Sequence, residues 1–277
     1  MIHRPPLSIS RRNQLVGDSF PLFLIRCILL VLILLPYKPA RADSEQEKVR
    51  IPILLYHRFG PIVADSMTVT TAVFENQLKF LKDHGYTIIP LKQLVGYLLG
   101  NGPPPPSRAV IITADDGHRS VFTDMFPLVR QYNCPVTLFI YPSAISNATY
   151  ALTWDQLREM QSSGLFDIES HSYWHPKFQK EKKRLAPSEY KNFVEMQLRR
   201  AKETLDKKLG IRVDMLAWPF GIYDEELIRQ ARQAGYIAAL TMERHSASTA
   251  DNSMALPRYL VTNADTGKRF ERLVAGK

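Results

Sequence analysis

Two short segments of the chain carry residue types that could together bind a metal ion and activate water. Residues 113–117 (TADDG) contain two adjacent aspartates, and residues 171–176 (HSYWHP) contain two histidines four residues apart. One carboxylate and two imidazoles make an open coordination shell for a catalytic divalent metal, and the second carboxylate is left free to act as a base. The two segments in this order therefore indicate a catalytic metal site with a base beside it.

Each segment also has a purely structural interpretation. Asp and Gly are common turn formers, so residues 115–117 could be only a polar turn, in which Gly117 lets the backbone bend sharply. A lone histidine at an apolar boundary is more often packed or solvated than a ligand. Two histidines at this spacing, combined with an Asp-Asp pair, favour the metal site.

The elements that must position these segments alternate between strand-like and helix-like patterns. Short apolar runs predict strands at residues 51–56, 86–89, 109–113, 136–141, 166–169, 214–218, 236–240 and 255–261. Helical patterns occur at residues 74–84, 91–99, 120–132, 154–163, 187–209, 224–234 and 268–274. This α/β alternation implies parallel strands joined by crossovers, and the number of repeats favours a distorted, TIM-barrel-like (β/α) barrel of seven or eight strands.

The unusual residues fall near the carboxyl ends of these predicted strands, where the active site of an α/β barrel forms. They are His57, Asp115, Asp116, His171, Trp218 and Arg258. Of the aromatic residues that follow these strands, we expect Trp218 and Phe220 to lie near the pocket.

The composition separates the first forty-odd residues from the rest. Arg4, Arg11 and Arg12 precede an apolar stretch, and Ala40-Arg41-Ala42 follows it. This order predicts a secretory signal peptide in residues 1–42, with an uncleaved membrane anchor as the alternative. Six of the 36 Lys and Arg and one of the 27 Asp and Glu lie in that segment, so residues 43–277 carry a net charge of only +4. Nucleic acid is therefore not expected as a partner, and the charged run at residues 180–184 predicts a solvated helix start or loop.

The two polar segments resemble the first two signature motifs of the carbohydrate esterase family 4 polysaccharide deacetylases, which share the chitooligosaccharide deacetylase homology domain. Tyr56-His57, residues 69–99 and residues 218–221 (WPFG) are most similar to the branch of bacterial poly-N-acetylglucosamine deacetylases. The resemblance covers residues 50–262, so residues 43–277 are expected to be one catalytic domain.

The resemblance implies a metal-dependent hydrolase that removes N-acetyl groups from an N-acetylglucosamine-containing polysaccharide. It implies that Asp115 is the general base and that Asp116, His171 and His175 are the metal ligands. Zinc is the default ion for such a shell, with cobalt, nickel or iron as alternatives. A backbone N–H near Tyr173 or Trp174 would help to hold the oxyanion.

The resemblance also implies a place in the cell. The protein is expected in the periplasm or cell envelope of a bacterium, in contact with a membrane only through an uncleaved N-terminal segment.

The chain departs from the family pattern in two places. The third motif commonly begins with an arginine that contacts the base; here Trp218 stands there, and Arg258 is a candidate to supply the charge. Many members carry a late histidine as general acid, where this chain has Tyr259. His57 and Arg258 join Trp218 and Phe220 as expected substrate-site residues. Two alternatives stay open: an O-acetyl esterase with the same apparatus, and a catalytically inactive carbohydrate-binding protein.

Overall fold

The eight strands predicted from the apolar runs are all present in the computed structural model of the protein, which describes residues 49–276. Seven follow one another in the order β10-β9-β8-β7-β6-β2-β12, β5 joins beside β6, and every one of these pairings is parallel. They are β2 (Ile53–Tyr56), β5 (Thr87–Ile88), β6 (Ala109–Asp115), β7 (Val136–Ile140), β8 (Phe166–Ser170), β9 (Met215–Ala217), β10 (Ala238–Leu240) and β12 (Tyr259–Leu260). The predicted parallel α/β class is confirmed.

The curvature of the sheet brings its two edge strands close together. The N–H of Thr241, just after β10, donates to the carbonyl of Leu256 (2.8 Å), and the N–H of Leu256 donates to the carbonyl of Ala239 (2.8 Å). Leu256 shortly precedes β12 and forms an isolated parallel bridge with Leu240. The sheet is thus curled into a distorted (β/α) barrel. The line along which its two edges meet is the seam of the barrel, and the segment that leads into β12 spans it.

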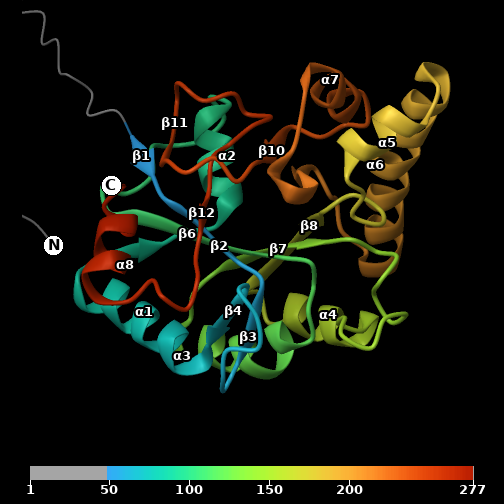
Figure 1. Ribbon diagram of the computed structural model, residues 1–277. Helices are drawn as coiled ribbons and strands as arrows, with labels where there is room; N and C mark the ends of the chain where they lie inside the picture. The colour runs from blue at the N-terminus through green and yellow to red at the C-terminus, as the bar shows by residue number, and fades with distance from the viewer. Residues whose placement is uncertain (1–48, 277) are drawn as a thin grey trace, which may run out of the picture. The chain divides into compact units, whose positions relative to one another are not determined.

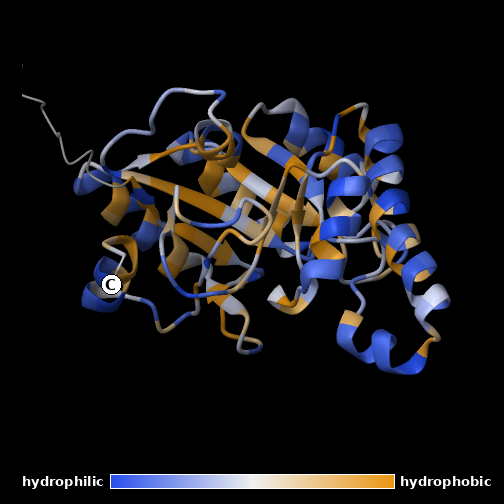
Figure 2. Ribbon diagram, turned by 90° about the horizontal axis from the view of Figure 1, so that it is seen from above, coloured by the Kyte–Doolittle hydropathy of each residue, from blue (hydrophilic) through white to orange (hydrophobic). Residues whose placement is uncertain are grey.

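Helices surround the strands and turn polar faces outward, while the strands between them are largely apolar (Figure 1, Figure 2). Helices α1, α3 and α4 lie along one side of the strands, and α5 and α6 lie together at one end (Figure 1). The helices are α1 (Thr71–Asp83), α2 (Leu91–Leu98), α3 (Phe126–Tyr132, after a π-helical turn at Val121–Met125), α4 (Trp154–Ser162), α5 (Phe178–Arg184), α6 (Pro187–Leu209), α7 (Glu225–Gln233) and α8 (Gly267–Val274).

The limits of α6 show why the helices could be predicted closely. Pro187 occupies the first turn, where its missing N–H is not needed, and Gly210 ends the helix with φ of 65°. Between them the buried positions recur every three or four residues, as an amphipathic helix requires. They are Tyr190, Val194, Gln197, Leu198, Ala201, Leu205 and Leu209.

Side-chain alternation along β6 decides which of its residues face the barrel interior. Ile111 packs with Phe139 in one apolar cluster, whereas Ile112 belongs to the larger cluster on the helix-covered side. Because successive side chains point to opposite faces of a strand, Thr113 and Asp115 share the interior face with Ile111. The strand therefore aims the Asp115 carboxylate into the barrel.

Some short elements were not predicted, because two or three residues show no periodicity. They are the antiparallel pair β1 (Arg50–Ile51) and β11 (Ala247–Ser248) and the parallel pair β3 (Arg58–Gly60) and β4 (Thr68–Thr70). The charged run at residues 180–184 is the body of α5 rather than a loop. Phe178 buries the start of that helix, and Lys182 Nζ lies 2.7 Å from Asp224 Oδ2.

The predicted signal peptide or anchor, residues 1–42, lies outside the described residues. Among residues 49–276, no helix combines the length and the apolar character needed to cross a membrane. The fold described above is therefore that of the predicted catalytic domain from residue 49 onward.

Candidate metal centre and active site

The turn after β6 separates the two aspartates. Asp115 is the last residue of the strand, and Asp116 leaves it with φ of 72°. Gly117 follows with φ of 69°, and a Cβ there would lie only 2.8 Å from Ile140 Cδ1. Both the backbone angle and the close approach require glycine, as the sharp turn expected at this position implies. The two carboxylates consequently leave the strand in different directions.

Asp116, His171 and His175 converge on one point. One possible ligand atom from each lies within 4.8 Å of the others, and no other such group occurs among residues 49–276. Asp116 Oδ1 is 3.7 Å from Nε2 of both histidines, whose ring centroids are 4.5 Å apart. Two imidazole nitrogens and one carboxylate oxygen form an open shell that fits a divalent cation.

The two histidines reach this point from the loop after β8, not from a helix. His171 Nδ1 lies 2.7 Å from the Ala217 carbonyl, so Nδ1–H donates there and Nε2 is left as the ligand atom. His175 has φ of 60°, and its N–H donates to Ser172 Oγ (3.2 Å). Burial lowers the pKa of His171 to about 3 and also lowers that of His175. Both rings are therefore neutral at pH 7, the form that binds a metal.

Asp115 is held by a buried arginine. Arg258 Nη1 and Nη2 donate to Asp115 Oδ1 and Oδ2, each at 2.8 Å, and Arg258 Nε donates to the Thr241 carbonyl (2.9 Å). Burial alone would raise the pKa of Asp115, but the charge and the hydrogen bonds of Arg258 lower it to about 2. Asp115 Oδ2 is 3.7 Å from His171 Nε2, so an ionised carboxylate lies directly beside the three candidate ligands.

Two expectations about the substrate site are wrong. Arg258 is fully buried and bound to Asp115, so it cannot contact a substrate and instead puts its charge on that carboxylate. Trp218 is also fully buried, and its Nε1–H donates to the Met254 carbonyl (2.9 Å). Trp218 follows β9 directly and packs inward, so its ring faces have no access to a sugar.

Phe220, in contrast, is 51% exposed and its ring centroid lies 4.5 Å from that of His175. Its φ of 58° turns the side chain out of the short 3₁₀ turn Pro219–Gly221 and toward the metal ligands. The structure therefore brings Phe220, but not its neighbour Trp218, to the candidate site.

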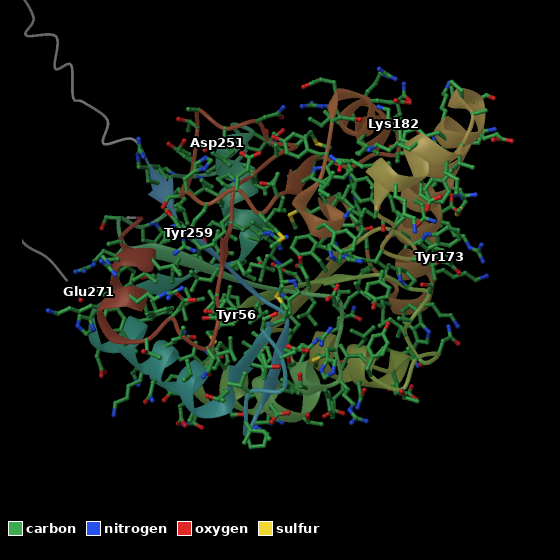
Figure 3. The ribbon with its side chains drawn as sticks, in the orientation of Figure 1. Tyr56, Tyr173, Lys182, Asp251, Tyr259 and Glu271 are labelled. Atoms are coloured by element: carbon green, nitrogen blue, oxygen red, sulfur yellow. The ribbon has the colours of Figure 1, made fainter. Side chains whose placement is uncertain are left out.

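His57 lies beside the two aspartates. The preceding side chain, Tyr56, points to the helix-covered side, where its hydroxyl donates to Gln77 Oε1 (2.9 Å; Figure 3). Alternation then directs His57 toward the interior face that Asp115 occupies. Burial lowers the pKa of His57, and the charges of Asp115 and Asp116 oppose that shift. Its Nδ1 is buried without a hydrogen-bond partner among the described residues.

Of the two residues expected to supply a backbone oxyanion donor, Tyr173 and Trp174, the second already uses its N–H. The N–H of Trp174 donates to the side-chain oxygen of Gln197 (3.0 Å), a fully buried residue of α6. A backbone N–H that is satisfied inside the protein is not free to bind a substrate oxygen.

A cavity of about 510 Å³ opens above the metal ligands. Its lining residues are Arg58, Asp116, His118, Tyr141, Tyr150, His175 and Phe220. The expectation that site residues lie at strand ends could have found Tyr141, which ends the predicted strand 136–141, and Arg58, two residues after the predicted strand 51–56. His118 and Tyr150 come from loops and carry no sequence signal.

Comparisons with known proteins agree with this geometry. The family profile described as polysaccharide deacetylase matches residues 102–239, a range that includes Asp115 and His175 but neither His57 nor Arg258. The putative polysaccharide deacetylase YxkH of Bacillus subtilis is 28% identical over 225 residues, covering 81% of this chain and 76% of that protein. A poly-beta-1,6-N-acetyl-D-glucosamine N-deacetylase of Staphylococcus epidermidis is 24% identical over 258 residues, covering 85% and 87%.

Solved structures share the fold. The deacetylase PplD of Streptococcus pyogenes, in complex with acetate, superposes with a TM-score of 0.73 at 22% identity, covering 82% of this chain and 99% of that one. IcaB from Ammonifex degensii gives a TM-score of 0.71 at 23% identity, covering 81% and 97%. At these identities the likeness supports the distorted barrel itself. The family profile over residues 102–239 shows that the chain contains a polysaccharide deacetylase domain.

Proposed function

We propose that this protein is a zinc-dependent amide hydrolase that removes N-acetyl groups from an N-acetylglucosamine polysaccharide. The observation that carries this proposal is the convergence of Asp116, His171 and His175 beside an ionised Asp115. The substrate class is supported by relatives named poly-beta-1,6-N-acetyl-D-glucosamine N-deacetylase.

Asp116, His171 and His175 would hold the metal, and two nitrogens with one oxygen suit zinc, with cobalt, nickel or iron as the alternatives. When bound, the cation supplies a Lewis acid that polarises the acetyl carbonyl and lowers the pKa of water. The chain fixes this shell in advance, because the Ala217 carbonyl sets the orientation of the His171 ring.

Asp115 is assigned as the general base. Arg258 takes one lone pair of each carboxylate oxygen, but each oxygen keeps a second one. Oδ2 lies 3.7 Å from His171 Nε2, so its free lone pair can accept a proton from a water molecule beside the ligands. Arg258 acts on the reaction through Asp115: it holds the carboxylate in place and keeps it ionised.

His57 is assigned to protonate the leaving amine. Tyr56 pairs with Ala114 between β2 and β6, so His57 lies level with Asp115, and it is not one of the three candidate ligands. Its ring is neutral at rest, but the charges of Asp115 and Asp116 favour its protonated form, so it can take up a proton during the reaction and pass it to nitrogen as the carbon–nitrogen bond breaks. This assignment fills the role for which the sequence, with Tyr259 at the usual position of the late histidine, offers no residue.

The proposal includes the cellular location. Residues 43–277 are the catalytic domain, and residues 1–42 direct export to the periplasm or cell envelope of a bacterium. The basic, apolar and Ala-x-Ala order of that segment supports export. A membrane is a partner only if the segment stays uncleaved, and an acetylated polysaccharide is the expected substrate.

An acetate-release assay tests the function. Oligomers of N-acetylglucosamine with β-1,6 and β-1,4 linkage and acetylated xylan are incubated with protein that has been treated with a chelator and then given zinc, cobalt or nickel. We expect acetate and a new amine from the N-acetylated oligomers only after metal is restored, and none with Asp115→Asn. Release from xylan alone would point to an O-acetyl esterase, and no release from any substrate would point to a binding protein.

A further inference from the structure

A tyrosine hydroxyl stands in the same cavity as the metal ligands. Tyr141 directly follows β7, the strand between those that lead to Asp116 and to His175. Its ring centroid lies 5.5 Å from that of His175, and it lines the cavity together with Asp116. The Tyr141 phenol is neutral at pH 7 and can donate a hydrogen bond.

The Tyr141 hydroxyl has one hydrogen-bond partner among the described residues, the hydroxyl of Tyr150, at 2.7 Å. Tyr150 belongs to the loop between β7 and α4, and this loop is fastened to the turn after β6. The Tyr150 carbonyl accepts the N–H of Arg119 (2.7 Å), and its ring lies parallel to that of His118, with centroids 6.3 Å apart. Tyr150 is thereby fixed at the rim of the cavity.

The other tyrosines near this edge of the barrel are engaged elsewhere. Tyr173 turns toward α6, where the Arg200 guanidinium lies over its ring at 4.2 Å (Figure 3). The hydroxyl of Tyr223 donates to Glu243 (2.9 Å). Of the two residues expected to supply a backbone oxyanion donor, Trp174 has its N–H bound to Gln197. When Tyr150 is the donor in its 2.7 Å hydrogen bond with Tyr141, the proton of Tyr141 is left for a ligand.

We propose that the Tyr141 hydroxyl donates a hydrogen bond to the carbonyl oxygen of the acetyl group under attack, and that Tyr150 positions Tyr141 for this role. The inference rests on the proposed deacetylase function. Tyr150 donates to Tyr141, and the proton of Tyr141 is then directed into the cavity, where negative charge develops on the carbonyl oxygen. A hydroxyl that itself accepts a hydrogen bond is a stronger donor, and a donor aimed at the developing charge lowers the barrier rather than only binding substrate.

The test compares four variants with the wild type: Tyr141→Phe, Tyr150→Phe, the double variant, and Tyr132→Phe as a matched control. Tyr132 lies on α3, outside the cavity, with its hydroxyl 3.5 Å from Glu75. Each replacement removes only an oxygen atom, and thermal unfolding checks that every variant is folded. The readouts are kcat and KM for acetate release from N-acetylglucosamine oligomers, and the affinity of the metal-loaded protein for acetate.

We expect Tyr141→Phe to lower kcat by about 10- to 100-fold and to change KM by less than about twofold. It should weaken acetate binding by about tenfold, because a hydrogen bond to a charged acceptor is lost. Tyr150→Phe should lower kcat by a smaller factor, and the double variant should be no slower than Tyr141→Phe, since Tyr150 acts only through Tyr141. Tyr132→Phe should match the wild type.

A kcat for Tyr141→Phe equal to that of the wild type, or a loss confined to KM, overturns the role of Tyr141. Multiplicative losses in the double variant overturn the role of Tyr150. An active wild type with an unaffected Tyr141→Phe variant refutes this inference alone. A wild type that releases no acetate from N-acetylated oligomers refutes the proposed function and this inference with it.

Discussion

Replacing Arg258 with glutamine is the change that most directly probes the predicted base. The guanidinium makes two 2.8 Å hydrogen bonds to Asp115 and is itself fully buried. In Arg258→Gln, burial still raises the pKa of Asp115, but the largest opposing charge is gone. An adjacent arginine lowers an aspartate pKa by about 1–3 units, so we expect the pKa of Asp115 to rise by that amount.

The kinetic consequence appears on the acid side of the pH profile. Asp115 must be ionised to take a proton, so activity is lost as pH falls through its pKa. The acid limb of kcat/KM should therefore move upward by about 1–3 pH units in Arg258→Gln. Arg258→Lys keeps the charge but not the two-point contact, and its limb should move less. Acetate release is measured from pH 3 to pH 9 in metal-loaded protein. The wild type, whose limb lies near pH 2, should keep its activity at the acid end of this range, and Arg258→Gln should lose activity there.

The stability consequence has a definite sign. The pKa of Asp115 is about 2 in the folded protein against the ordinary 3.8. At about 1.4 kcal/mol per unit, ionised Asp115 contributes about 2 kcal/mol to the free energy of unfolding. Because the folded pKa is the lower one, this contribution is present above pH 3.8 and is lost as pH falls toward 2. At pH 7, Arg258→Gln leaves a buried carboxylate without its partner, which should cost about 3–5 kcal/mol.

Arg199→Gln is the matched control, because it removes an exposed arginine paired with Glu195 at 2.9 Å. Exposed ion pairs contribute less than about 1 kcal/mol to the free energy of unfolding. This variant should therefore keep the pH profile and the urea unfolding midpoint of the wild type. A folded Arg258→Gln protein with an unmoved acid limb would refute the reasoning, since Asp115 would then not be the group whose ionisation limits the rate.

Three further changes have defined outcomes. Asp116→Ala should reduce bound metal by at least about tenfold, because it removes the only carboxylate among the three candidate ligands. Bound metal is measured by atomic absorption after dialysis, and an undiminished amount would show that the ligand set is wrong. Gly117→Ala should lower the free energy of unfolding by about 1–3 kcal/mol, since it combines φ of 69° with a Cβ 2.8 Å from Ile140 Cδ1; an unchanged urea midpoint would contradict this. Phe220→Ala should raise KM for oligomers with little effect on the unfolding temperature, whereas Trp218→Ala should destabilise the fold by about 3–5 kcal/mol. A destabilised Phe220→Ala protein and a fully stable Trp218→Ala protein would contradict the exposed position of Phe220 and the buried position of Trp218.

The strands and the four principal site residues could be predicted because each depends on local sequence. Apolar runs mark the strands, and parallel strands bring their carboxyl ends to one edge. Asp115 ends β6, Asp116 follows it, and His171 follows β8, two strands away in the sheet. Proximity of these residues thus follows from the order of strands and needs no detail of packing.

The pairing of Arg258 with Asp115 could not be predicted in the same way. The two residues are 143 positions apart, and their contact depends on how the segment before β12 crosses the seam of the barrel. The sequence pattern placed Arg258 near the carboxyl end of a strand, but Arg258 directly precedes β12, and strand position alone does not say whether a side chain faces the cavity or the interior. The same limit explains Trp218, where alternation past the end of β9 turns the ring to the helix-covered side, as it does for Leu216.

Backbone angles at the site carry information that no periodic pattern contains. Four of the six non-glycine residues with positive φ among residues 49–276 belong to the site: Asp116, Ser172, His175 and Phe220. Asp and His tolerate this conformation better than most residues, and both bind metals, so the residue types that suit the strained turns are also those that suit the ligand shell. A phenylalanine gains nothing from such a conformation, which costs about 1–3 kcal/mol. That the chain keeps Phe220 there, with its ring against His175, indicates that the ring serves the cavity rather than the stability of the fold.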